Sequence, residues 1–471
     1  MSALPPDAAA RQWPLDLEPA QRQQLAHQAF ELIEHLLERR DGAPIFAPTP
    51  PQRIEAMMAM PPERAIGAQE LLDRLRSVAE CGWSKEHGGD LGYIPNGGIY
   101  SGVIAAMLAA GLHTFTGSAF EQPGLIALEE SVLRWMAHVL GMPLATEGLL
   151  LSGGSLANQT AIVSARDRGD FAPDRSVAYL SERAHHSLRK AMHLCGIPGE
   201  CIRSIRATSL GRIDMAALHE QVERDQALGR HPWLLVGVAG STDTGSIDPL
   251  DELAALASRH GAWFHVDAAY GGMFALTQRG AARLRGIDAA DSVVVNAHKG
   301  LFLPYGVAAV LVRAPGALAR AHLGEGAYMR DVPPGMPGLP HYFERGPELT
   351  RPFRGLLVWL PLHLHGVASF RQALDRSLDL AELAATRLRA VPGIDVLHEP
   401  ELSIVAFKST AGDAATQRIL AAINQSGELR VSSTTLQGRV AIRLAFLHPR
   451  TREAHIDAVE HLVRQALAST L

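Results

Sequence analysis

The chain has 471 residues, enough for two or three domains, and its 47% hydrophobic and 20% charged residues are typical of a globular protein with a sizeable core. Its net charge of -5 comes without a basic stripe, which excludes an electrostatic surface for nucleic acid or for an anionic membrane. Small molecules are therefore the expected partners.

The cysteines and the apolar runs indicate the compartment. Cys81, Cys195 and Cys201 are odd in number and have no C-x-x-C spacing, so neither a disulfide framework nor a metal site is expected. The first residues lack the basic-then-apolar pattern of a signal peptide, and no apolar run reaches the about 18 residues that cross a bilayer. We expect a cytoplasmic protein.

Residues 1–85 predict an arm rather than a compact domain. Residues 19–40 place apolar side chains at helical spacing on one face, which predicts an amphipathic helix. The next residues, up to 54, are rich in proline and are expected to be extended. Such an arm packs either on a partner subunit or on its own chain, and the pattern is compatible with both.

From about residue 125 the pattern alternates helices with short apolar strands. Helices are expected at 125–141, 156–169, 184–196 and 250–261, and strands at 148–152, 176–181, 233–241, 262–268, 293–295 and 307–312. This series predicts a large α/β domain over residues 86–350, with a mostly parallel sheet flanked by helices. Ligands of such sheets bind at the carboxyl ends of the strands.

A long segment rich in glycine and proline, residues 324–349, follows the last of these strands. A loop of this length in a compact protein is usually functional. Helices are expected again at 354–389, strands at 394–410, a helix at 414–425, a strand at 439–448 and a last helix from Thr451. This run predicts a smaller C-terminal α/β domain over residues 351–471.

Three features lie at expected strand ends. Gly153, Gly154 and Ser155 separate a strand from a helix N-terminus, where free backbone N–H groups favour a phosphate. Asp267 ends the strand "FHVD", and Lys299 follows 32 residues later (299 − 267), about one helix and one strand. The carboxylate and the amine can therefore stand on neighbouring strands.

Each feature alone also has a purely structural explanation: a glycine-rich turn, a helix cap, or an ammonium group in water. Together, a phosphate cradle, a carboxylate and an amine are what pyridoxal phosphate requires, because the amine forms a Schiff base and the acid keeps the pyridine nitrogen protonated. His185 in "SERAHHSLRK" either stacks on such a cofactor or caps the helix that follows.

Nine stretches carry a family resemblance: GYIPNGG, ALEESVLRWMAHVLGMP, SGGSLAN, AHHSL, GSTDTGSIDPL, HVDAAYGG, ADSVVVNAHKGL, ELTRPFRGLLVWL and AIRLAFLHPRT. Over almost its whole length the chain resembles the group II pyridoxal-phosphate-dependent decarboxylases of fold type I, the family of aromatic-L-amino-acid and glutamate decarboxylases. The resemblance implies a mostly parallel seven-stranded sheet and a homodimer with shared active sites. It also implies that the arm wraps the neighbour and that a mobile catalytic loop, residues 324–345, reaches the neighbour's site.

The resemblance implies four catalytic residues. Lys299 is the Schiff-base lysine, Asp267 pairs with the pyridinium nitrogen and His185 stacks on the ring. Tyr328, in the long loop, matches the tyrosine that protonates the carbanion after carbon dioxide leaves.

Two further sets of residues follow from the same resemblance. The predicted cofactor-binding residues are Gly154, Ser155, His185, Thr242, Asp267, Ala269, Asn296, His298 and Lys299. The predicted substrate-binding residues are Arg443, Tyr93, Ile94 and Phe120. Arg443 matches an arginine associated with the carboxylate end of the substrate, although a structural ion pair is equally compatible with its position.

The expected reaction is decarboxylation of an L-amino acid to the amine and carbon dioxide. GYIPNGG and the chain length favour an aromatic substrate: tyrosine, tryptophan, Dopa or phenylalanine. The alternatives are an acidic or diamino acid (glutamate, aspartate or 2,4-diaminobutyrate), whose polar side chain Arg320, Arg330, His341 or His363 could bind, and a cofactor-dependent aldolase, lyase or aldehyde synthase.

The stretch around the lysine departs from the family pattern. Many relatives have proline and tryptophan where this chain has Ala297 and Gly300. Gly300 is expected to leave space, or backbone freedom, beside Lys299.

Overall fold

The computed structural model describes residues 15–38, 43–95, 97–324 and 336–468. The chain divides into two compact units, Met1–His87 and Gly88–Leu471. In the first unit lie helices α1 (Pro19–Glu38), α2 (Pro51–Met57) and α3 (Ala68–Ala79) and the antiparallel strands β1 (Phe46–Ala47) and β2 (Gly82–Trp83). The predicted first helix is confirmed, but α2 occupies residues expected to be extended, because the fixed φ of proline at Pro51 suits the first turn of a helix.

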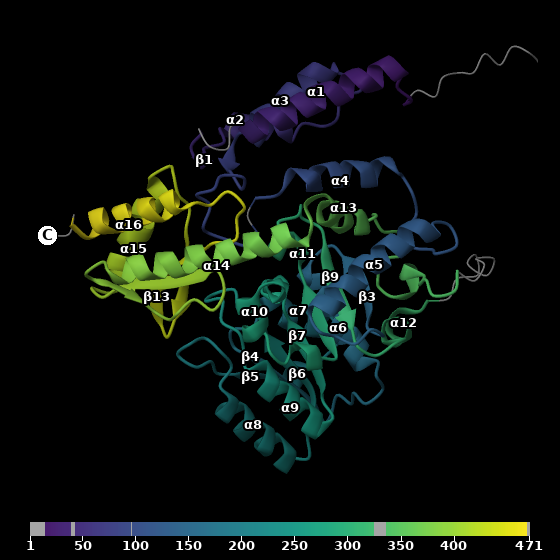
Figure 1. Ribbon diagram of the computed structural model, residues 1–471, viewed down its shortest axis with the longest axis vertical. Coiled ribbons are helices and arrows are strands. Elements are labelled where there is room, and N and C mark those ends of the chain that lie inside the picture. The colour runs from purple at the N-terminus through teal and green to yellow at the C-terminus, as the bar shows by residue number, and fades with distance from the viewer. Residues whose placement is uncertain (1–14, 39–42, 96, 325–335, 469–471) are drawn as a thin grey trace, which may run out of the picture. The chain divides into compact units, whose positions relative to one another are not determined.

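A seven-stranded sheet forms the centre of the second unit, with the order β3-β9-β8-β7-β6-β4-β5 (Figure 1). Six strands run in one direction, and β9 runs against its neighbours β3 and β8. The predicted mostly parallel α/β architecture is confirmed. The strands are β3 (Glu147–Leu151), β4 (Ser176–Ser181), β5 (Ile202–Ile205), β6 (His231–Val238), β7 (Trp263–Asp267), β8 (Ser292–Val295) and β9 (Ala308–Val312).

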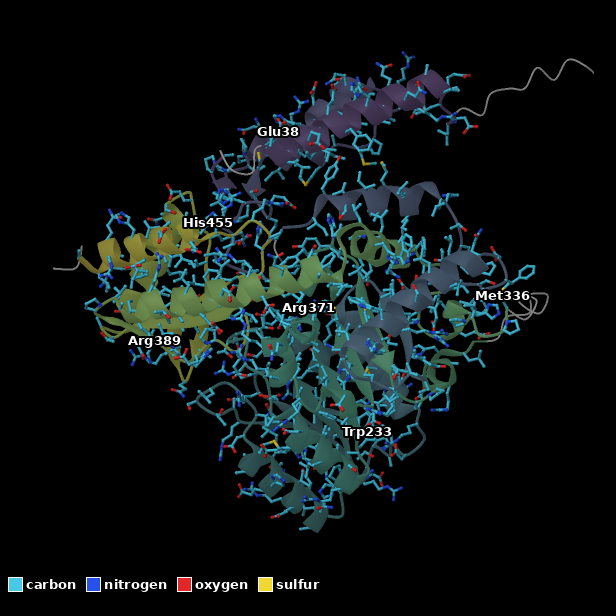
Figure 2. The ribbon with its side chains drawn as sticks, viewed as in Figure 1. Glu38, Trp233, Met336, Arg371, Arg389 and His455 are labelled. Carbon is cyan, nitrogen blue, oxygen red and sulfur yellow. The ribbon has the colours of Figure 1, made fainter. Side chains whose placement is uncertain are left out.

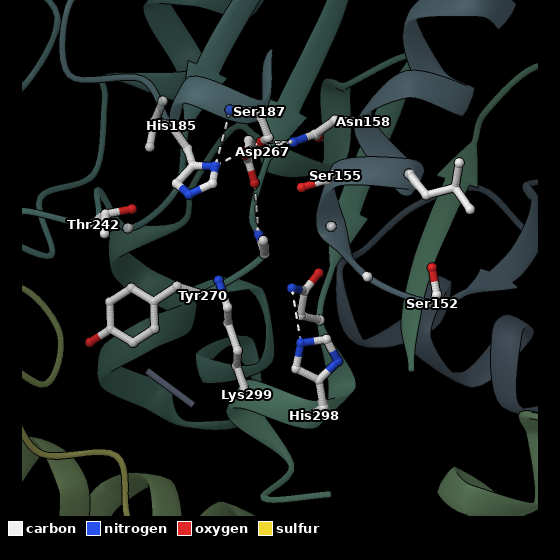
Figure 3. Close-up of a pocket in the computed structure, with 17 residues that line it drawn as sticks. Ser152, Ser155, Asn158, His185, Ser187, Thr242, Asp267, Tyr270, His298 and Lys299 are labelled. Atoms are coloured by element: carbon white, nitrogen blue, oxygen red, sulfur yellow. Dashed lines mark hydrogen bonds between the residues drawn. The ribbon is translucent and has the colours of Figure 1, made fainter. Parts of the chain in front are cut away.

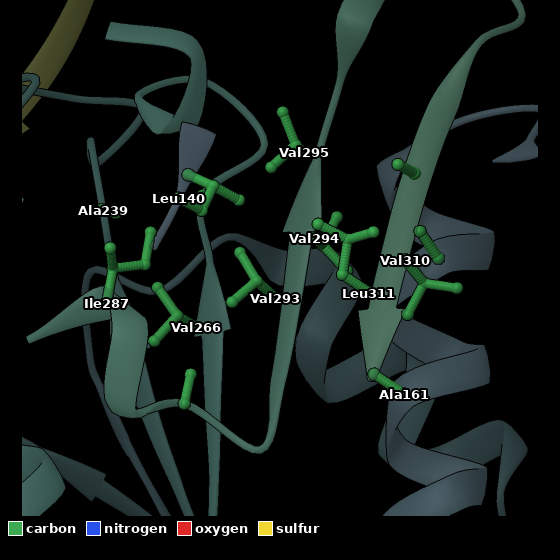
Figure 4. Packing of buried hydrophobic residues seen from close by; sticks show 14 of the residues in the cluster. Leu140, Ala161, Ala239, Val266, Ile287, Val293, Val294, Val295, Val310 and Leu311 are labelled. Atoms are coloured by element: carbon green, nitrogen blue, oxygen red, sulfur yellow. The ribbon is translucent and has the colours of Figure 1, made fainter. Parts of the chain in front are cut away.

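The middle strands are buried on both faces, which is why their sequences are continuous apolar runs rather than alternating ones. Val293, Val294 and Val295 of β8 are fully buried beside Val310 and Leu311 of β9 (Figure 4). Trp233 of β6, labelled in Figure 2, is also fully buried, and the centroid of its ring lies 4.7 Å from that of Phe171.

Helices and short 3₁₀ turns precede, connect or follow the strands of this sheet. The helices are α4 (Tyr100–Gly111), α5 (Pro123–Val139), α6 (Gly154–Arg166), α7 (His186–Leu194), α8 (Met215–Ala227), α9 (Leu250–His260), α10 (Gln278–Arg283), α11 (Ala297–Gly300) and α12 (Ala317–His322). The 3₁₀ turns are η2 (Gly199–Cys201), η3 (Gly272–Leu276), η4 (Ile287–Ala289) and η6 (Tyr342–Glu344). Because α6 and α7 each follow a strand of the sheet, their N-termini lie at its carboxyl edge.

A four-stranded antiparallel sheet follows, with the order β10-β11-β13-β12. Its strands are β10 (Ile394–Val396), β11 (Ile404–Ser409), β12 (Ser432–Leu436) and β13 (Arg439–Ala445), and the helices of this region are α13 (Gly355–His365), α14 (Val367–Arg389), α15 (Asp413–Gln425) and α16 (Glu453–Ala468). The predicted helical run 354–389 is interrupted at Gly366, where φ is +73°.

The second unit contains two clusters of buried apolar side chains. One surrounds the seven-stranded sheet and the other the four-stranded sheet. Helix α14 contributes Phe370, Leu374 and Leu378 to the first cluster and Leu380 and Leu388 to the second. The predicted domain boundaries at residues 85 and 350 stay predictions. None of the described helices has both the length and the apolar character needed to cross a membrane.

Candidate active site

A cavity of about 370 Å³ opens where β3, β4, β6, β7 and β8 end. These five strands run in one direction, so residues that follow their carboxyl ends converge on one edge of the sheet. The nine predicted cofactor-binding residues all line this cavity (Figure 3): Gly154, Ser155, His185, Thr242, Asp267, Ala269, Asn296, His298 and Lys299.

Lys299 lies on the short helix α11, directly after β8. Its side chain extends into the cavity toward Asp267 (Figure 3). Burial lowers the pKa of the Lys299 amine, and the positive charge of Arg443 acts in the same direction against the opposing effect of Asp267. A larger fraction of the amine is therefore neutral, and the neutral amine is the form that attacks a carbonyl carbon.

Asp267 is the last residue of β7 and pairs in register with Val238 of β6 and Val294 of β8. The predicted placement of the carboxylate and the amine after neighbouring strands is confirmed. Asp267 Oδ1 accepts a hydrogen bond from the backbone N–H of Ala269 (3.1 Å), and Oδ2 accepts one from Asn158 Nδ2 (3.1 Å). Two donors thus hold the carboxylate while it faces the cavity.

His185 caps helix α7 and also lines the cavity. Its Nδ1 accepts a hydrogen bond from the backbone N–H of Ser187 (3.3 Å) and lies 2.7 Å from the Ser187 hydroxyl. Burial lowers the pKa of the His185 imidazole more than the charge of Asp267 raises it. The helix cap, one of the two roles that the sequence left open for His185, is present, and stacking of the ring on a cofactor stays a proposal compatible with it.

The N-terminus of α6 forms another wall of the cavity, together with Asn296 and His298, which follow β8. The first backbone N–H groups of α6, from Gly154 onward, have no carbonyl partner within the helix. His298 Nδ1 donates to the carbonyl of Val307 (2.7 Å), and its Nε2 lies 3.3 Å from Asn296 Nδ2. Burial lowers the pKa of His298 to about 4, so the ring is neutral and its Nε2 accepts from the amide.

Asn296 Oδ1 is buried and has no hydrogen-bond partner among the described residues. A buried polar atom in this state points to a bound group. The free N–H groups, this amide, the carboxylate and the amine together fit a cofactor that has a phosphate, a basic ring nitrogen and a carbonyl group.

Gly154→Ala is expected to weaken binding of pyridoxal phosphate by about tenfold or more, because the new Cβ would lie 2.9 Å from Asn296 Oδ1 and would narrow the cavity at the N-terminus of α6. An absorbance titration of the cofactor measures this. Gly199→Ala is the matched control, since Gly199 lies in η2, does not line the cavity, and a Cβ there would meet no described atom within 4 Å. Equal affinities in the two variants would contradict a cradle at Gly154.

The expected space beside Gly300 is filled. A Cβ at Gly300 would lie 2.6 Å from the Cβ of Met273 in η3. The backbone at Gly300 is outside the left-handed region, so conformational freedom does not explain the glycine either. Glycine is required there because Met273 packs directly against its Cα.

The four predicted substrate-binding residues do not line this cavity. Arg443 is buried and its Nη1 donates to the carbonyl of Gly92 (2.7 Å) and to Ser432 Oγ (2.9 Å), while its Nε has no partner among the described residues. Arg443 forms no ion pair with a described residue. Tyr93 and Phe120 are about half exposed, with Arg430 over the Tyr93 ring, and Ile94 is partly buried.

The residues proposed for a polar substrate are also away from the cavity. Arg320 lies on α12, His341 Nδ1 accepts from the N–H of Ala119, and His363 stacks on Trp359. Tyr328 and Arg330 lie outside the described residues.

Four further polar residues of the cavity were not singled out from the sequence: Ser152, Asn158, Ser187 and Tyr270. Tyr270 exchanges hydrogen bonds with Ser403, which joins the end of β7 to the residues before β11. Asn158 and Ser187 lie within the quoted stretches SGGSLAN and AHHSL, and an asparagine inside a helix is unfavourable enough to have been a signal.

Known proteins resemble this chain in sequence and in fold. Residues 68–410 match the family model described as the pyridoxal-dependent decarboxylase conserved domain. Aromatic-L-amino-acid decarboxylase of Bacillus atrophaeus is 32% identical over 450 residues, 93% of each chain. L-2,4-diaminobutyrate decarboxylase of Rhizobium meliloti (strain 1021) is 30% identical over 381 residues, 78% of this chain and 74% of that protein. The solved structure of Oryza sativa TDC with PLP and tryptamine has a TM-score of 0.90 at 22% identity and covers 97% of this chain and 99% of its own.

Proposed function

Because the chain belongs to the pyridoxal-dependent decarboxylase family, it is a lyase that decarboxylates an amino acid with pyridoxal 5'-phosphate, and we propose that its substrate is an aromatic L-amino acid. The observation that carries this proposal is the match along 93% of the chain to an aromatic-L-amino-acid decarboxylase.

The charges of the cavity support the same choice. Apart from the phenol of Tyr270, which stays neutral because burial raises its pKa, the ionisable side chains among the described lining residues are the four of His185, His298, Asp267 and Lys299. We assign all four to the cofactor. No charged group of this set is then left to pair with a charged substrate side chain, which favours an apolar one.

The roles of the chain's own residues follow from where they stand. When bound, the cofactor supplies an electron sink for the electron pair that is released when the Cα–carboxylate bond breaks. We propose that Asp267 keeps the ring nitrogen of the cofactor protonated, because a nearby carboxylate favours the protonated, charged form of a buried base. Lys299 is the residue that would hold the cofactor covalently, through its side-chain amine.

We propose further that the first turn of α6 and Ser155 hold the phosphate, with Asn296 and His298 on the other side. His185 covers one face of the ring and excludes water there. Arg443 is assigned to the substrate carboxylate. Its buried Nε, which has no hydrogen-bond partner among the described residues, and its effect on the pKa of Lys299 support a place near the reacting atoms.

A substrate panel tests the proposal. We expect tyrosine, tryptophan, Dopa or phenylalanine to give kcat/KM at least about tenfold above glutamate, aspartate and 2,4-diaminobutyrate, measured as carbon dioxide release with the amine identified by mass spectrometry. The relative from Rhizobium meliloti makes 2,4-diaminobutyrate the second candidate. A preference for that diamino acid would replace the aromatic assignment and leave the reaction class unchanged.

Tyr328→Phe is expected to shift the product from amine toward aldehyde with uptake of oxygen, because the family resemblance assigns Tyr328 to protonation of Cα after the carboxylate leaves. The ratio of amine to aldehyde, measured by mass spectrometry together with oxygen consumption, reports the shift. Tyr100→Phe, a tyrosine of α4 that does not line the cavity, is the control. An unchanged amine yield in Tyr328→Phe would remove this role.

We also propose that the enzyme is a homodimer with shared sites and that residues 1–85 act as an arm on the partner. Exposed apolar side chains support this: Met107, Leu108 and Leu112 along and beyond α4 and Leu71 and Leu75 of α3 are each between 45% and 54% exposed. Three free thiols, at Cys81, Cys195 and Cys201, support a cytoplasmic location.

A further inference from the structure

A series of buried hydrogen bonds leads from the interior of the large sheet to the cavity. The indole Nε1 of Trp263 donates to Ser292 Oγ (2.8 Å), and the same oxygen lies 2.8 Å from His265 Nδ1. His265 Nε2 lies 3.1 Å from Asn158 Oδ1. All four side chains are at most 3% exposed.

Asn158 connects this series of hydrogen bonds to two residues that line the cavity. Its Nδ2 donates to Asp267 Oδ2 (3.1 Å) and to Ser187 Oγ (3.3 Å), and Ser187 Oγ lies 2.7 Å from His185 Nδ1 (Figure 3). Because a carboxamide has two N–H protons, both are used. One amide therefore contacts the carboxylate at the ring nitrogen and, through Ser187, the imidazole over the ring.

At each end of this series, some groups can act only as a hydrogen-bond donor or only as an acceptor, and they fix the direction of the neighbouring hydrogen bonds. The indole N–H of Trp263 can only donate, so Ser292 Oγ accepts from it. The carboxylate of Asp267 can only accept, so Asn158 turns its Nδ2 to Asp267 and its Oδ1 to His265 Nε2. At the other end, the backbone N–H of Ser187 can only donate, so His185 Nδ1 is an acceptor.

The central bonds then have one consistent arrangement. Because Asn158 Oδ1 can only accept, a neutral His265 carries its proton on Nε2, and its Nδ1 then accepts from the Ser292 hydroxyl. Burial lowers the pKa of His265 to about 4, which keeps the ring neutral. The reversed amide would place Oδ1 against Asp267 and an N–H group against that of His265, so the amide has one favourable orientation.

We propose that Asn158 is a positioning residue for the reaction: held in one orientation by His265, it keeps the carboxylate of Asp267 oriented as an acceptor toward the ring nitrogen and keeps the proton of His185 on Nε2. The inference rests on the proposed roles of Asp267 and His185. It adds a residue on α6 and one inside β7 to the machinery of the site, neither of which needs to touch the substrate.

Neutron diffraction from deuterium-exchanged crystals of the full chain with pyridoxal phosphate tests the arrangement directly. We expect deuterons on Nε2 alone in both His185 and His265 and the nitrogen of the Asn158 amide facing Asp267. A deuteron on Nδ1 of either ring, or the amide oxygen facing Asp267, overturns the proposal. This test needs no substrate. Its result therefore does not depend on whether the substrate is an aromatic amino acid, and the two proposals can fail separately.

Matched variants test the consequence. Asn158→Asp keeps the shape and the acceptor for His265 but sets a second carboxylate against Asp267, whereas Asn158→Leu removes donor and acceptor together. Thr160→Val is the control, because Thr160 is buried on the same helix and its hydroxyl donates only to the carbonyl of Leu156.

Equilibrium dialysis gives the dissociation constant of pyridoxal phosphate for each variant. We expect it to rise about ten- to hundredfold in both Asn158 variants and to stay within about threefold in the control. With substrate, kcat falls while KM stays within about threefold, since Asn158 does not touch the substrate. A purely structural role predicts that the isosteric Asn158→Asp binds the cofactor like the native chain, and that result overturns the proposal. If neither variant folds, the neutron result decides.

Discussion

Lys299→Arg is expected to abolish decarboxylation while leaving the chain folded. A guanidinium stays protonated in proteins and cannot condense with the carbonyl of pyridoxal phosphate, whereas the pKa of the Lys299 amine is lowered by burial. Loss of a covalent group at the reacting centre costs about 10⁴-fold or more in kcat/KM. Carbon dioxide release with the preferred substrate measures the loss, and thermal unfolding measures the fold.

Borohydride reduction and peptide mass spectrometry locate the covalent bond. The native chain should carry one pyridoxyl group on the peptide that contains Lys299, and the variant none. Lys408→Arg is the matched control, since Lys408 lies on β11 opposite Asp395 and away from the cavity. An adduct at another lysine, or turnover by Lys299→Arg, would contradict the assignment.

Asp267→Asn is expected to lower kcat by about 10²- to 10³-fold, because a neutral amide cannot hold a positive charge on the ring nitrogen. The side chain is nearly isosteric and stays between Asn158 and Ala269, so the fold should change little. Steady-state decarboxylation and the absorbance of the bound cofactor measure the effect.

Asp291→Asn is the control for loss of a carboxylate from the same sheet. Asp291 lies before β8, at the end of the sheet opposite the cavity, and its Oδ2 accepts from the N–H of Phe264 (2.8 Å), a bond that an amide oxygen preserves. We expect native turnover from this variant. Near-normal turnover from Asp267→Asn would refute a role for its charge.

Much of the site could be predicted because it depends on positions along strands. Once the strands of a parallel sheet are identified, residues after their carboxyl ends must meet, and this placed Asp267, Lys299 and Gly154 at one cavity. The strand 176–181 was predicted with its exact bounds for the same reason: a buried apolar run has clear ends.

What could not be predicted depends on contacts between distant segments. Met273 fills the space at Gly300, and Asn158 reaches Asp267 across more than a hundred positions of sequence. Strand β12 was not predicted, since its Ser/Thr-rich sequence lacks an apolar run and is paired only with β13. Strand β5, for which no prediction was made, pairs only with β4 and is partly exposed.

Helix α14 has a consequence for how the second unit unfolds. Its 23 residues pack one end into the core of the large sheet and the other into the core of the small sheet. Unfolding of either core removes the surface that supports half of this helix. Unfolding of one core therefore destabilises the other. We therefore expect the two sheets to share one cooperative transition, in which a cofactor bound at the large sheet also protects the small one.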